Sequence, residues 1–507
     1  KPLYYTFDAH GFAFASEIKA LLAPLDQRPR LNLEALDQYL ALRLIDAPLS
    51  MFEGVHKLPP GCALTLEADA APQIRRYWDL RQAPKLGGAE QSLIDELEAR
   101  VEEALRLHLV SDVPVGVFLS GGIDSSLLVA MLNRRLGIES LPTFTAGLDY
   151  EEYDEAPVAR ALAQLLHTNH HDTHITPVIG SLLPDLVWAL DEPSDPLSAC
   201  MWLLAQFARR HVKVVLGGDG GDELFGGYDR YYGNLYASHY SRVPAALRRT
   251  LLAPAVALIP ESGWYKSLGH QLRWLHNLSF HMGGARYAAS LSYFYFDRER
   301  RAALFSEEVR QRWSAFDAEA AIRTPYEQAS GDALDRMLYA DSNVRLPNHP
   351  VMITDRVCMA HGLEVRSPFM DHKLAEFAAQ LPSTLKVRRG SLRYIQRKLA
   401  SRYLPTETVN RPKQGFSSAL PYILQSQYAK LYEAYLRDAH LARDRILDAA
   451  YIARLFGEHA AGRADHGNRL WLLINAEVWY RMMILGQSRE DVREGLWLTR
   501  TQARLAG

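Results

Sequence analysis

The stretch that most constrains the fold is VPVGVFLSGGIDSS, residues 113–126, where an apolar run leads into small polar residues. The run VPVGVFL is apolar almost throughout, which is typical of a strand buried on both faces of a sheet. A segment with helical spacing, SSLLVAMLNRRLG, follows it and ends at Gly137. A buried strand, a glycine-rich turn and a helix in this order predict an open α/β sheet with a ligand at the carboxyl end of the strand.

Strand and helix patterns alternate from residue 92 to about residue 218. The further predicted strands are LPTFTAGL, TNHHDTHIT and VKVVLGG, and the predicted helices between them include DEAPVARALAQLLH and ACMWLLAQFARRH. This alternation predicts a doubly wound parallel sheet with right-handed crossovers. Helical patterns dominate from about Tyr228 onward, so the expected fold class is α/β with a helical carboxyl-terminal part.

A change of pattern near residue 80 predicts a domain boundary. The first eighty residues contain short strands such as PLYYTFD and GFAFAS, separated by a turn at residues 9–11. The segment RQAPKLGGAEQ, residues 81–91, carries proline, glycine and charge without periodicity. A chain of 507 residues is also too long for one ordinary domain. We therefore expect a β-rich domain at 1–80, a linker at 81–91 and a second domain at 92–507.

Composition disfavours several classes of function. Lys and Arg number 57 against 59 Asp and Glu, a formal net charge of −2, so the chain lacks the basic field typical of nucleic-acid binding. The longest apolar runs, such as LLAPAVALI at 251–259, are too short to span a bilayer. The three cysteines, Cys62, Cys200 and Cys358, form no CxxC pair and are interpreted as small buried hydrophobes. We expect a cytoplasmic protein that binds neither nucleic acid nor membrane.

The polar part of the opening stretch has the chemistry of a phosphate site. Gly121 and Gly122 let successive backbone N–H groups approach an anion, and the following helix adds its positive end. The hydroxyl groups that can add donors are those of Ser120, Ser125 and Ser126. The GK[ST] ending of a Walker A loop is absent. Asp124 would repel phosphate by itself, and its presence therefore predicts a bridging Mg²⁺ ion.

A second glycine-rich segment, VVLGGDGGDELFGGY at 214–228, repeats the arrangement of buried strand and polar turn. Asp219 and Asp222 lie three residues apart, a spacing that lets both side chains enter one loop cavity. We predict that Asp222 and Asp124 are the two Mg²⁺ ligands. Such acids suit a reaction in which a metal ion spreads the negative charge of a phosphate leaving group.

At this point the sequence resembles a known family. SGGIDSS resembles the pyrophosphate loop of ATP pyrophosphatases, whose fold is adenine nucleotide alpha hydrolase-like. The glycine-rich segment above, together with FTAGLDYEEYDEAPVARALAQLLHTNHH, MAHGLEVRSPFMDHKL and RPKQGF, resembles asparagine synthetases of the glutamine-hydrolysing type. The resemblance implies that aspartate and ATP form a β-aspartyl-AMP, which ammonia from glutamine converts to asparagine with release of AMP and pyrophosphate. It also implies a possible homodimer.

The resemblance assigns roles to further residues. Asp219 matches the position that supports formation of the acyl-adenylate, and Lys413 of RPKQGF matches the lysine that stabilises pyrophosphate as it leaves. Adenine and ribose contacts are implied, mostly through the backbone, at Leu119, Ala146, Gly217 and Gly218.

The amino-terminal segment resembles only the closing part of a glutaminase domain. FASEIKALL and GVHKLPPG match the end of the family's class II, Ntn-hydrolase glutaminase, whose nucleophile is an amino-terminal cysteine. This chain begins at Lys1, so we identify no glutaminase nucleophile within it. We expect that an upstream segment of the natural protein carries that cysteine and that the chain, as given, does not hydrolyse glutamine.

The acceptor that is amidated stays open. LPNHPVMITDRVCMA, residues 346–360, stands where many relatives read closer to LPDDLLVKVDRASMA. Acids, leucine and lysine are replaced there by Asn348, His349, Pro350 and Thr354. One alternative is therefore the same chemistry on another carboxylate, such as a sugar uronic acid of a surface polysaccharide. An alternative of another class is a non-catalytic ATP-binding protein.

Two charged segments receive structural interpretations. Glu364, Arg366 and Asp371 in LEVRSPFMDH lie among apolar residues, which predicts a buried ion network, with a supporting catalytic role for Glu364 as the alternative. The histidines of HTNHHDTH, residues 167–174, would be divided between two faces by strand alternation, so we do not expect them to form a metal site.

Overall fold

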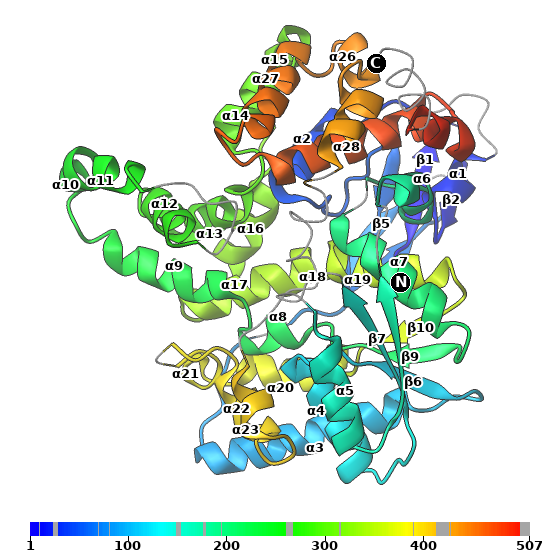
Figure 1. The fold of residues 1–507 in the computed structure, drawn as a ribbon, viewed down its shortest axis with the longest axis vertical. Helices are drawn as coiled ribbons and strands as arrows, with labels where there is room; N and C mark the ends of the chain where they lie inside the picture. The colour runs from blue at the N-terminus through cyan, green and yellow to red at the C-terminus, as the bar shows by residue number, and fades with distance from the viewer. Residues whose placement is uncertain are drawn as a thin grey trace.

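The computed structural model describes residues 1–9, 11–23, 29–68, 70–80, 82–148, 154–175, 179–193, 195–259, 267–313, 316–388, 390–411, 425 and 427–496. Its centre is a five-stranded, wholly parallel sheet in the order β10-β9-β6-β7-β8 (Figure 1). The strands are β6 (Val115–Phe118), β7 (Pro142–Leu148), β8 (Asn169–Ile175), β9 (Val214–Leu216) and β10 (Glu364–Arg366).

The chain runs outward from β6 through β7 to β8 and then returns to β9 on the other side of β6. The strand order therefore reverses between β6 and β9, which is where open α/β sheets bind ligands.

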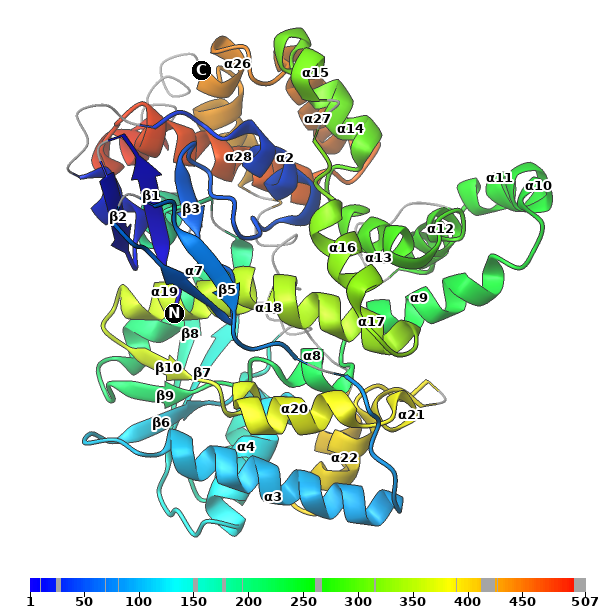
Figure 2. The same ribbon diagram turned by 180° about the vertical axis from the view of Figure 1, so that it is seen from behind.

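Helices cover both faces of this sheet (Figures 1 and 2). On one face, α6 (Ile179–Leu190), α7 (Pro196–Ala208) and α19 (Pro350–Met359) share an apolar cluster with Phe144, Ala146 and Val215. Val117, Leu119 and Leu216 point to the other face. The helices that pack there are α3 (Glu90–His108), α4 (Ile123–Arg134), α5 (Ala156–Leu165), α20 (His372–Gln380) and α22 (Tyr394–Ala400). The expected doubly wound parallel sheet is thus confirmed.

The amino-terminal residues form two small antiparallel sheets and two helices. β1 (Tyr4–Asp8) pairs with β2 (Gly11–Ala15) and with β3 (Val55–Lys57), and β4 (Cys62–Thr65) pairs with β5 (Gln73–Arg76). The helices are α1 (Ile18–Leu22) and α2 (Leu33–Leu42), the latter capped by the Asn32 side chain. The β-rich character predicted for this part is confirmed.

The amino-terminal part and the rest of the chain pack around a common core. Tyr4, Leu36 and Phe52 belong to the same apolar cluster as Phe144 of β7 and Trp479 near the carboxyl end. Packing is therefore continuous across residue 80, and the division into 1–80, 81–91 and 92–507 stays a prediction.

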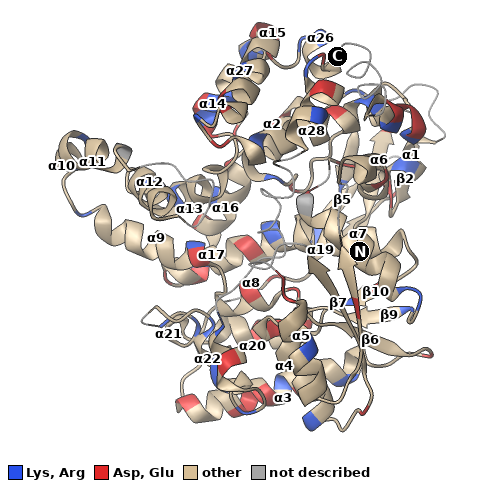
Figure 3. Cartoon of the chain, in the orientation of Figure 1, with Lys and Arg blue, Asp and Glu red and all other residues tan. Residues whose placement is uncertain are grey.

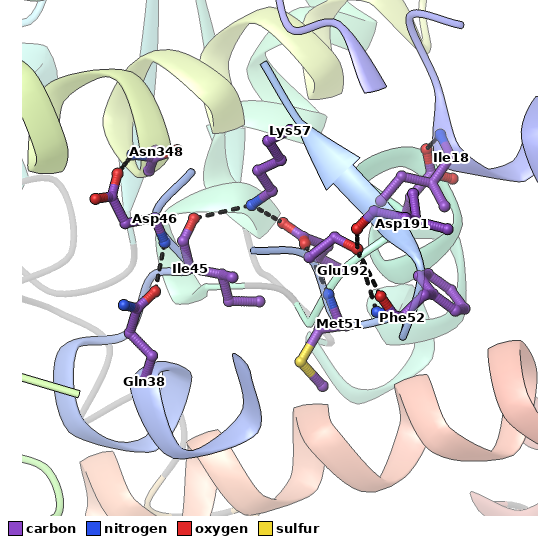
Figure 4. A network of polar contacts seen from close by, with 12 residues as sticks. Ile18, Gln38, Ile45, Asp46, Met51, Phe52, Lys57, Asp191, Glu192 and Asn348 are labelled. Atoms are coloured by element: carbon purple, nitrogen blue, oxygen red, sulfur yellow. Dashed lines mark hydrogen bonds and ion pairs between the residues drawn. The ribbon is translucent and has the colours of Figure 1, made fainter. Parts of the chain in front are cut away.

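Buried polar contacts reinforce this junction (Figure 4). Lys57 Nζ donates to Ile45 O at 2.9 Å and to Glu192 Oε2 at 2.6 Å. Asn348 Nδ2 donates to Asp46 Oδ1 at 2.8 Å, and Asp46 in turn donates its backbone N–H to Gln38. The amino-terminal part is therefore held against the segment after α6 and against the residues that precede α19.

The remaining helices form an extended arm and a cap over the amino-terminal sheet (Figures 1 and 2). Lys and Arg are interspersed with Asp and Glu along them (Figure 3). No helix within the described ranges is both long and apolar enough to cross a membrane. The principal helices are α8 (Gly221–Phe225), α9 (Asp229–Tyr240), α12 (Leu268–Leu278), α13 (Gly283–Ser292), α14 (Arg298–Leu304), α15 (Glu307–Trp313), α16 (Ala320–Gln328), α17 (Ala333–Ala340), α27 (Ala449–Ala460) and α28 (Gly467–Trp479).

The prediction of one buried ion network in LEVRSPFMDH is wrong. Its first three residues are the edge strand β10, and the Glu364 side chain is 46% exposed beside Arg366. Arg366 Nη1 instead donates to the carbonyls of His108, the last residue of α3, and of Val110. Asp371 caps α20 by accepting from the N–H groups of Lys373 and Leu374. Three charges near each other in sequence thus serve three separate structural purposes.

Strand alternation divides the β8 histidines between the two faces of the sheet, as expected. His170 Nδ1 lies 3.0 Å from Thr143 Oγ1, whereas the His171 ring stacks on Phe144 at 5.5 Å between centroids. Of the cysteines, Cys200 and Cys358 are buried, as predicted, and Cys62 is half-buried.

Candidate functional site

A cavity of about 750 Å³ opens at the carboxyl ends of β6 and β9, where the strand order reverses. Most residues that the sequence nominated line it, and they come from three strand ends. They are Leu119, Ser120, Gly121, Gly122, Asp124, Ser125, Ala146, Gly217, Gly218, Asp219 and Asp222. The structure therefore brings together the two glycine-rich segments that the sequence singled out separately.

In the loop after β6, the Ser120 N–H donates to Ser125 Oγ at 3.2 Å and the Gly122 N–H donates to Ser120 Oγ at 3.3 Å. Gly121 has φ 72°, a left-handed conformation that favours glycine. The hydroxyls of Ser120 and Ser125 lie 3.1 Å apart, and Ser125 Oγ also donates to Gly122 O at 3.2 Å. α4 begins at Ile123 without a side-chain cap, which leaves the positive end of a twelve-residue helix at the cavity.

Ser126 is the exception within this loop. Its side chain is fully buried in α4, and Ser126 is absent from the cavity lining. A residue one position further along a helix points about 100° away, so Ser125 and Ser126 cannot both face the cavity. The structure therefore does not place the Ser126 hydroxyl in the cavity, and its predicted phosphate role stays a prediction.

The two glycine-rich loops touch each other at Asp124. A Cβ placed on Gly221 would lie 2.9 Å from Asp124 Cγ and still closer to one of its oxygens. A Cβ on Gly218 would lie 3.0 Å from Asp124 Cβ. These glycines are thus required for the close approach of the loops, which brings Asp124 and Asp222 to one place.

Arg393 joins the two predicted metal ligands and was not anticipated from the sequence. Its Nη1 lies 3.1 Å from Asp124 Oδ2, and its Nη2 donates to Asp222. Gln396 Nε2 donates to Asp124 Oδ1 at 2.8 Å. Both residues come from SLRYIQRK at the start of α22, a polar and basic stretch that carries no recognisable spacing signal.

One guanidinium contacts both carboxylates through its two terminal nitrogens, so Asp124 and Asp222 lie within the span of a single cationic group. The two side chains are 17% and 13% exposed, so they face the cavity from partly buried positions. Two carboxylates beside a phosphate-type loop match the donor set that Mg²⁺ uses together with phosphate oxygens and water. The residues present therefore fit the implied ion.

Of the two predicted catalytic residues, Asp219 and Lys413, only Asp219 falls within the described part of the chain. Asp219 lines the cavity, and its charge adds to burial in raising the pKa of the Cys358 thiol on α19. α19 therefore lies close to the loop after β9. Lys413 falls outside the described residues.

Opposite these loops, Arg43, Arg345, His349 and Thr354 line the other side of the cavity. We call these four residues the far wall, and residues 119–125 and 217–222 the loop wall. Arg345 lies over the Tyr228 ring at 4.9 Å, with Glu223 at 3.8 Å. The sequence flagged His349 and Thr354 as departures from relatives, but carried no signal for Arg43.

A buried carboxylate behind the far wall joins two of its members. Asp195 Oδ2 lies 2.8 Å from Arg43 Nε and 3.1 Å from His349 Nε2. Burial alone would raise the pKa of this carboxyl, but Arg43 and His349 hold it well below its usual range. Burial also lowers the pKa of His349, to about 4, against the opposing effect of Asp195. The far wall therefore presents the neutral imidazole of His349 beside Arg43, whose positive charge is balanced by the Asp195 carboxylate.

Comparison with known proteins yields matches along nearly the whole chain. A family model described as asparagine synthase matches residues 96–481, and one described as glutamine amidotransferase domain matches residues 1–78. A putative glutamine-hydrolysing asparagine synthetase of Mycobacterium tuberculosis is 33% identical over 497 residues, covering 96% of this chain and 73% of that protein. Glutamine-hydrolysing asparagine synthetase 1 of Bacillus subtilis is 29% identical over 498 residues, 96% of this chain and 74% of that protein. A protein of Gibberella zeae named amidase chry2 is 27% identical over 455 residues, 82% of this chain and 65% of that protein.

Proposed function

Because the chain belongs to the glutamine-hydrolysing asparagine synthetase family, we propose that its cavity adenylates the side-chain carboxylate of aspartate and then amidates it. The carboxylate attacks the α-phosphorus of ATP, β-aspartyl-AMP forms and pyrophosphate leaves. Ammonia derived from glutamine then attacks the acyl carbon, and AMP leaves with asparagine as the product. The observation that carries this proposal is the contact of two glycine-rich loops, each with an acidic residue, at the reversal of strand order.

The chain's own groups supply most of what adenylation needs. Backbone N–H groups of residues 120–122 and the hydroxyls of Ser120 and Ser125 bind the pyrophosphate, supported by the positive end of α4. The N–H groups of Ser120 and Gly122 then exchange their bonds to the serine hydroxyls for bonds to phosphate oxygens. Adenine and ribose lie against the backbone at Leu119, Ala146, Gly217 and Gly218 in this proposal. Asp124 and Asp222 would hold Mg²⁺, which when bound spreads the charge of the leaving pyrophosphate. Asp219 and Lys413 support the same step.

Pyrophosphate release from Mg·ATP, measured with L-aspartate and ammonium chloride, tests the proposal. Ammonium supplies nitrogen without glutamine hydrolysis, so the assay reports the synthetase reaction by itself. We expect release that depends on aspartate, together with asparagine in the product. A folded protein that binds ATP but releases no pyrophosphate with aspartate would refute aspartate as the acceptor.

A second candidate is the same chemistry on a different carboxylate, such as a uronic acid or a peptide. The far wall favours keeping this alternative, because Arg345 and His349 present an arginine and a neutral imidazole where the acceptor would lie. A screen of uronic acids and peptides in the same assay separates the two candidates. ATP binding without turnover on any acid would support the non-catalytic alternative. Cytoplasmic location and a homodimer stay predictions.

A further inference from the structure

His349 and Arg43 separate the large cavity from a second, very small one. The small cavity, about 10 Å³, lies between α2 of the amino-terminal part, the segment after α6 and the start of α19. Apolar residues such as Leu44, Met352 and Ile353 line it together with the polar side chains of Glu192, Asp195 and Asn348. Both cavities are lined by His349 and Arg43, and this pair therefore stands between the amino-terminal part and the reaction site.

One nitrogen of His349 is firmly held and the other is not. Nε2 lies 3.1 Å from Asp195 Oδ2, and Asp195 is itself fixed by Arg43 and by the Leu197 N–H at 2.7 Å. The His349 side chain is only 6% exposed, and its Nδ1 is buried. Within the described part of the chain, this Nδ1 has no hydrogen-bond partner. A buried polar atom left unpaired costs about 1–3 kcal/mol, so its retention calls for a ligand.

The hydrogen bond to Asp195 determines the tautomer. A carboxylate only accepts, so Nε2 carries the hydrogen and Nδ1 presents a lone pair. The charged groups that act on this imidazole are the Asp195 carboxylate, which favours a positive charge on it, and the guanidinium groups of Arg43 and Arg345, which oppose one. The preferred ligand is therefore a small molecule that can donate a hydrogen, and the cavity of about 10 Å³ that His349 also lines has room only for a molecule of that size.

We propose that His349 is the ammonia-receiving residue of this cavity, with Nδ1 accepting a hydrogen of ammonia and acting as the base when ammonia attacks the acyl-adenylate. This inference rests on the proposed function. It assigns a catalytic group that the sequence comparison marked only as a departure from relatives.

The proposed step balances as follows. The ammonia lone pair forms a C–N bond with the acyl carbon, and the C–O bond to the phosphate breaks with its electron pair leaving on AMP. One proton of the attacking nitrogen passes to His349 Nδ1. The resulting imidazolium is stabilised by Asp195, as in other histidine–carboxylate pairs, and then releases the proton to solvent.

The test separates adenylation from nitrogen transfer in the variant His349→Gln. Gln keeps a donor for Asp195 but has no second basic nitrogen. We expect the single-turnover burst of pyrophosphate to stay within about 3-fold, while amide formation from ammonium falls about 10²-fold. Hydroxylamine forms an adduct that loses its proton to water more readily, so hydroxamate formation is expected to fall less than about 10-fold.

A matched control is His466→Gln. His466 is also buried, and its Nε2 lies 2.8 Å from the Glu458 carboxylate, outside the cavity lining. We expect all three rates to stay at the wild-type level in this variant. If His349→Gln does not fold, the smaller His349→Asn takes its place with the same readouts.

Equal losses of the pyrophosphate burst and the amide in the His349 variant would overturn the inference, as would a loss of hydroxamate as large as that of amide. Failure of the proposed function shows differently, because the wild type would then release no pyrophosphate with aspartate.

Discussion

The two walls of the cavity are built in opposite ways. The loop wall comes from two continuous segments, each a buried strand followed by glycines and an acid. Each segment predicts a ligand-binding turn from its own consecutive residues. The far wall takes Arg43 from the end of α2, Arg345 from the π-helix η3 (Asp341–Arg345), and His349 and Thr354 from the start of α19. The difference teaches that phosphate chemistry can be encoded locally, whereas the surroundings of the acceptor are assembled from distant segments.

The largest expected effect concerns the loop wall. If Asp222 is a metal ligand, Asp222→Asn should lower pyrophosphate release about 10³-fold, because the leaving pyrophosphate loses its compensating charge. Pyrophosphate release at saturating Mg·ATP measures it. The control is Asp172→Asn on β8, an acid that pairs with Arg160 at the surface and should change the rate less than about 2-fold. Similar losses in both variants would refute a local role for Asp222.

The next effect concerns the stability of the contact between α14 and α2, the helix whose end carries Arg43 of the far wall. Asp37 of α2 and Arg301 of α14 form a fully buried pair, with Nε 2.8 Å from Oδ1 and a further bond from Trp313 Nε1 at 2.7 Å. Asp37→Asn leaves the buried Arg301 with only the more distant Glu319 carboxylate, 3.6 Å from Nη1, which should lower the free energy of unfolding by about 3 kcal/mol. Urea denaturation measures this change. Glu433→Gln, which breaks an exposed pair with Arg437, should cost no more than about 0.5 kcal/mol.

A smaller effect returns to the contact between the two loops. Gly221→Ala would push its Cβ into the Asp124 carboxylate, so we expect pyrophosphate release to fall about 10-fold while the fold is kept. Gly457→Ala in α27 is the matched control, because nothing lies within 4 Å of a Cβ there. That variant should be about 0.5–1 kcal/mol more stable with unchanged activity, since alanine favours a helix interior. An unaffected rate in Gly221→Ala would show that the loops do not need this approach.

The smallest effect is a pH dependence behind the far wall. Burial raises the pKa of Asp46 to about 7, so the folded protein keeps this carboxyl protonated at pH values where the unfolded chain has lost the proton. The folded state then binds more protons, and its stability falls as pH rises from about 4 to about 7. Each pKa unit corresponds to about 1.4 kcal/mol, but relaxation of a buried site reduces the effect.

We therefore expect Asp46→Asn to be about 1 kcal/mol more stable than wild type at pH 8 and equal to it at pH 4. The midpoint of urea denaturation at the two pH values measures this difference. A gain of the same size at both pH values would show that the titration of Asp46 is not its cause.

Much of the fold could be read from apolar periodicity. The strands β6, β7, β8 and β9 and the helices α4, α5 and α7 lie where the sequence predicted them, because each has a strong local pattern. The edge strand β10 was missed because three charged or half-exposed residues do not look like a buried strand. α6 was not predicted, and its sequence carries Pro184 within the helix.

The candidate site shows the same division. Glycine, serine and acid spacing nominated residues 120–122, 124, 125 and 222 of the loop wall, whereas Leu119, Gly217 and Gly218 were nominated through the family resemblance. The phosphate role of Ser126, which lies buried in α4, stays a prediction. Arg393 was not nominated, because nothing in SLRYIQRK indicates that one guanidinium will reach both acids. The roles of the nominated residues in ATP binding and catalysis stay predictions.

By itself the sequence determined the α/β architecture, the family and the two polar turns that lie at strand ends. These properties depend on local patterns, because a buried strand, a glycine turn and the start of a helix are each determined by residues that are adjacent in the sequence. Only the tertiary structure decided that Arg43 and His349 share the Asp195 carboxylate, and that His349 keeps one nitrogen unpaired in the described structure. The physical reason is that burial and pairing depend on which segments pack together, and residues from α2, α7 and α19 meet only after the chain has folded around one core.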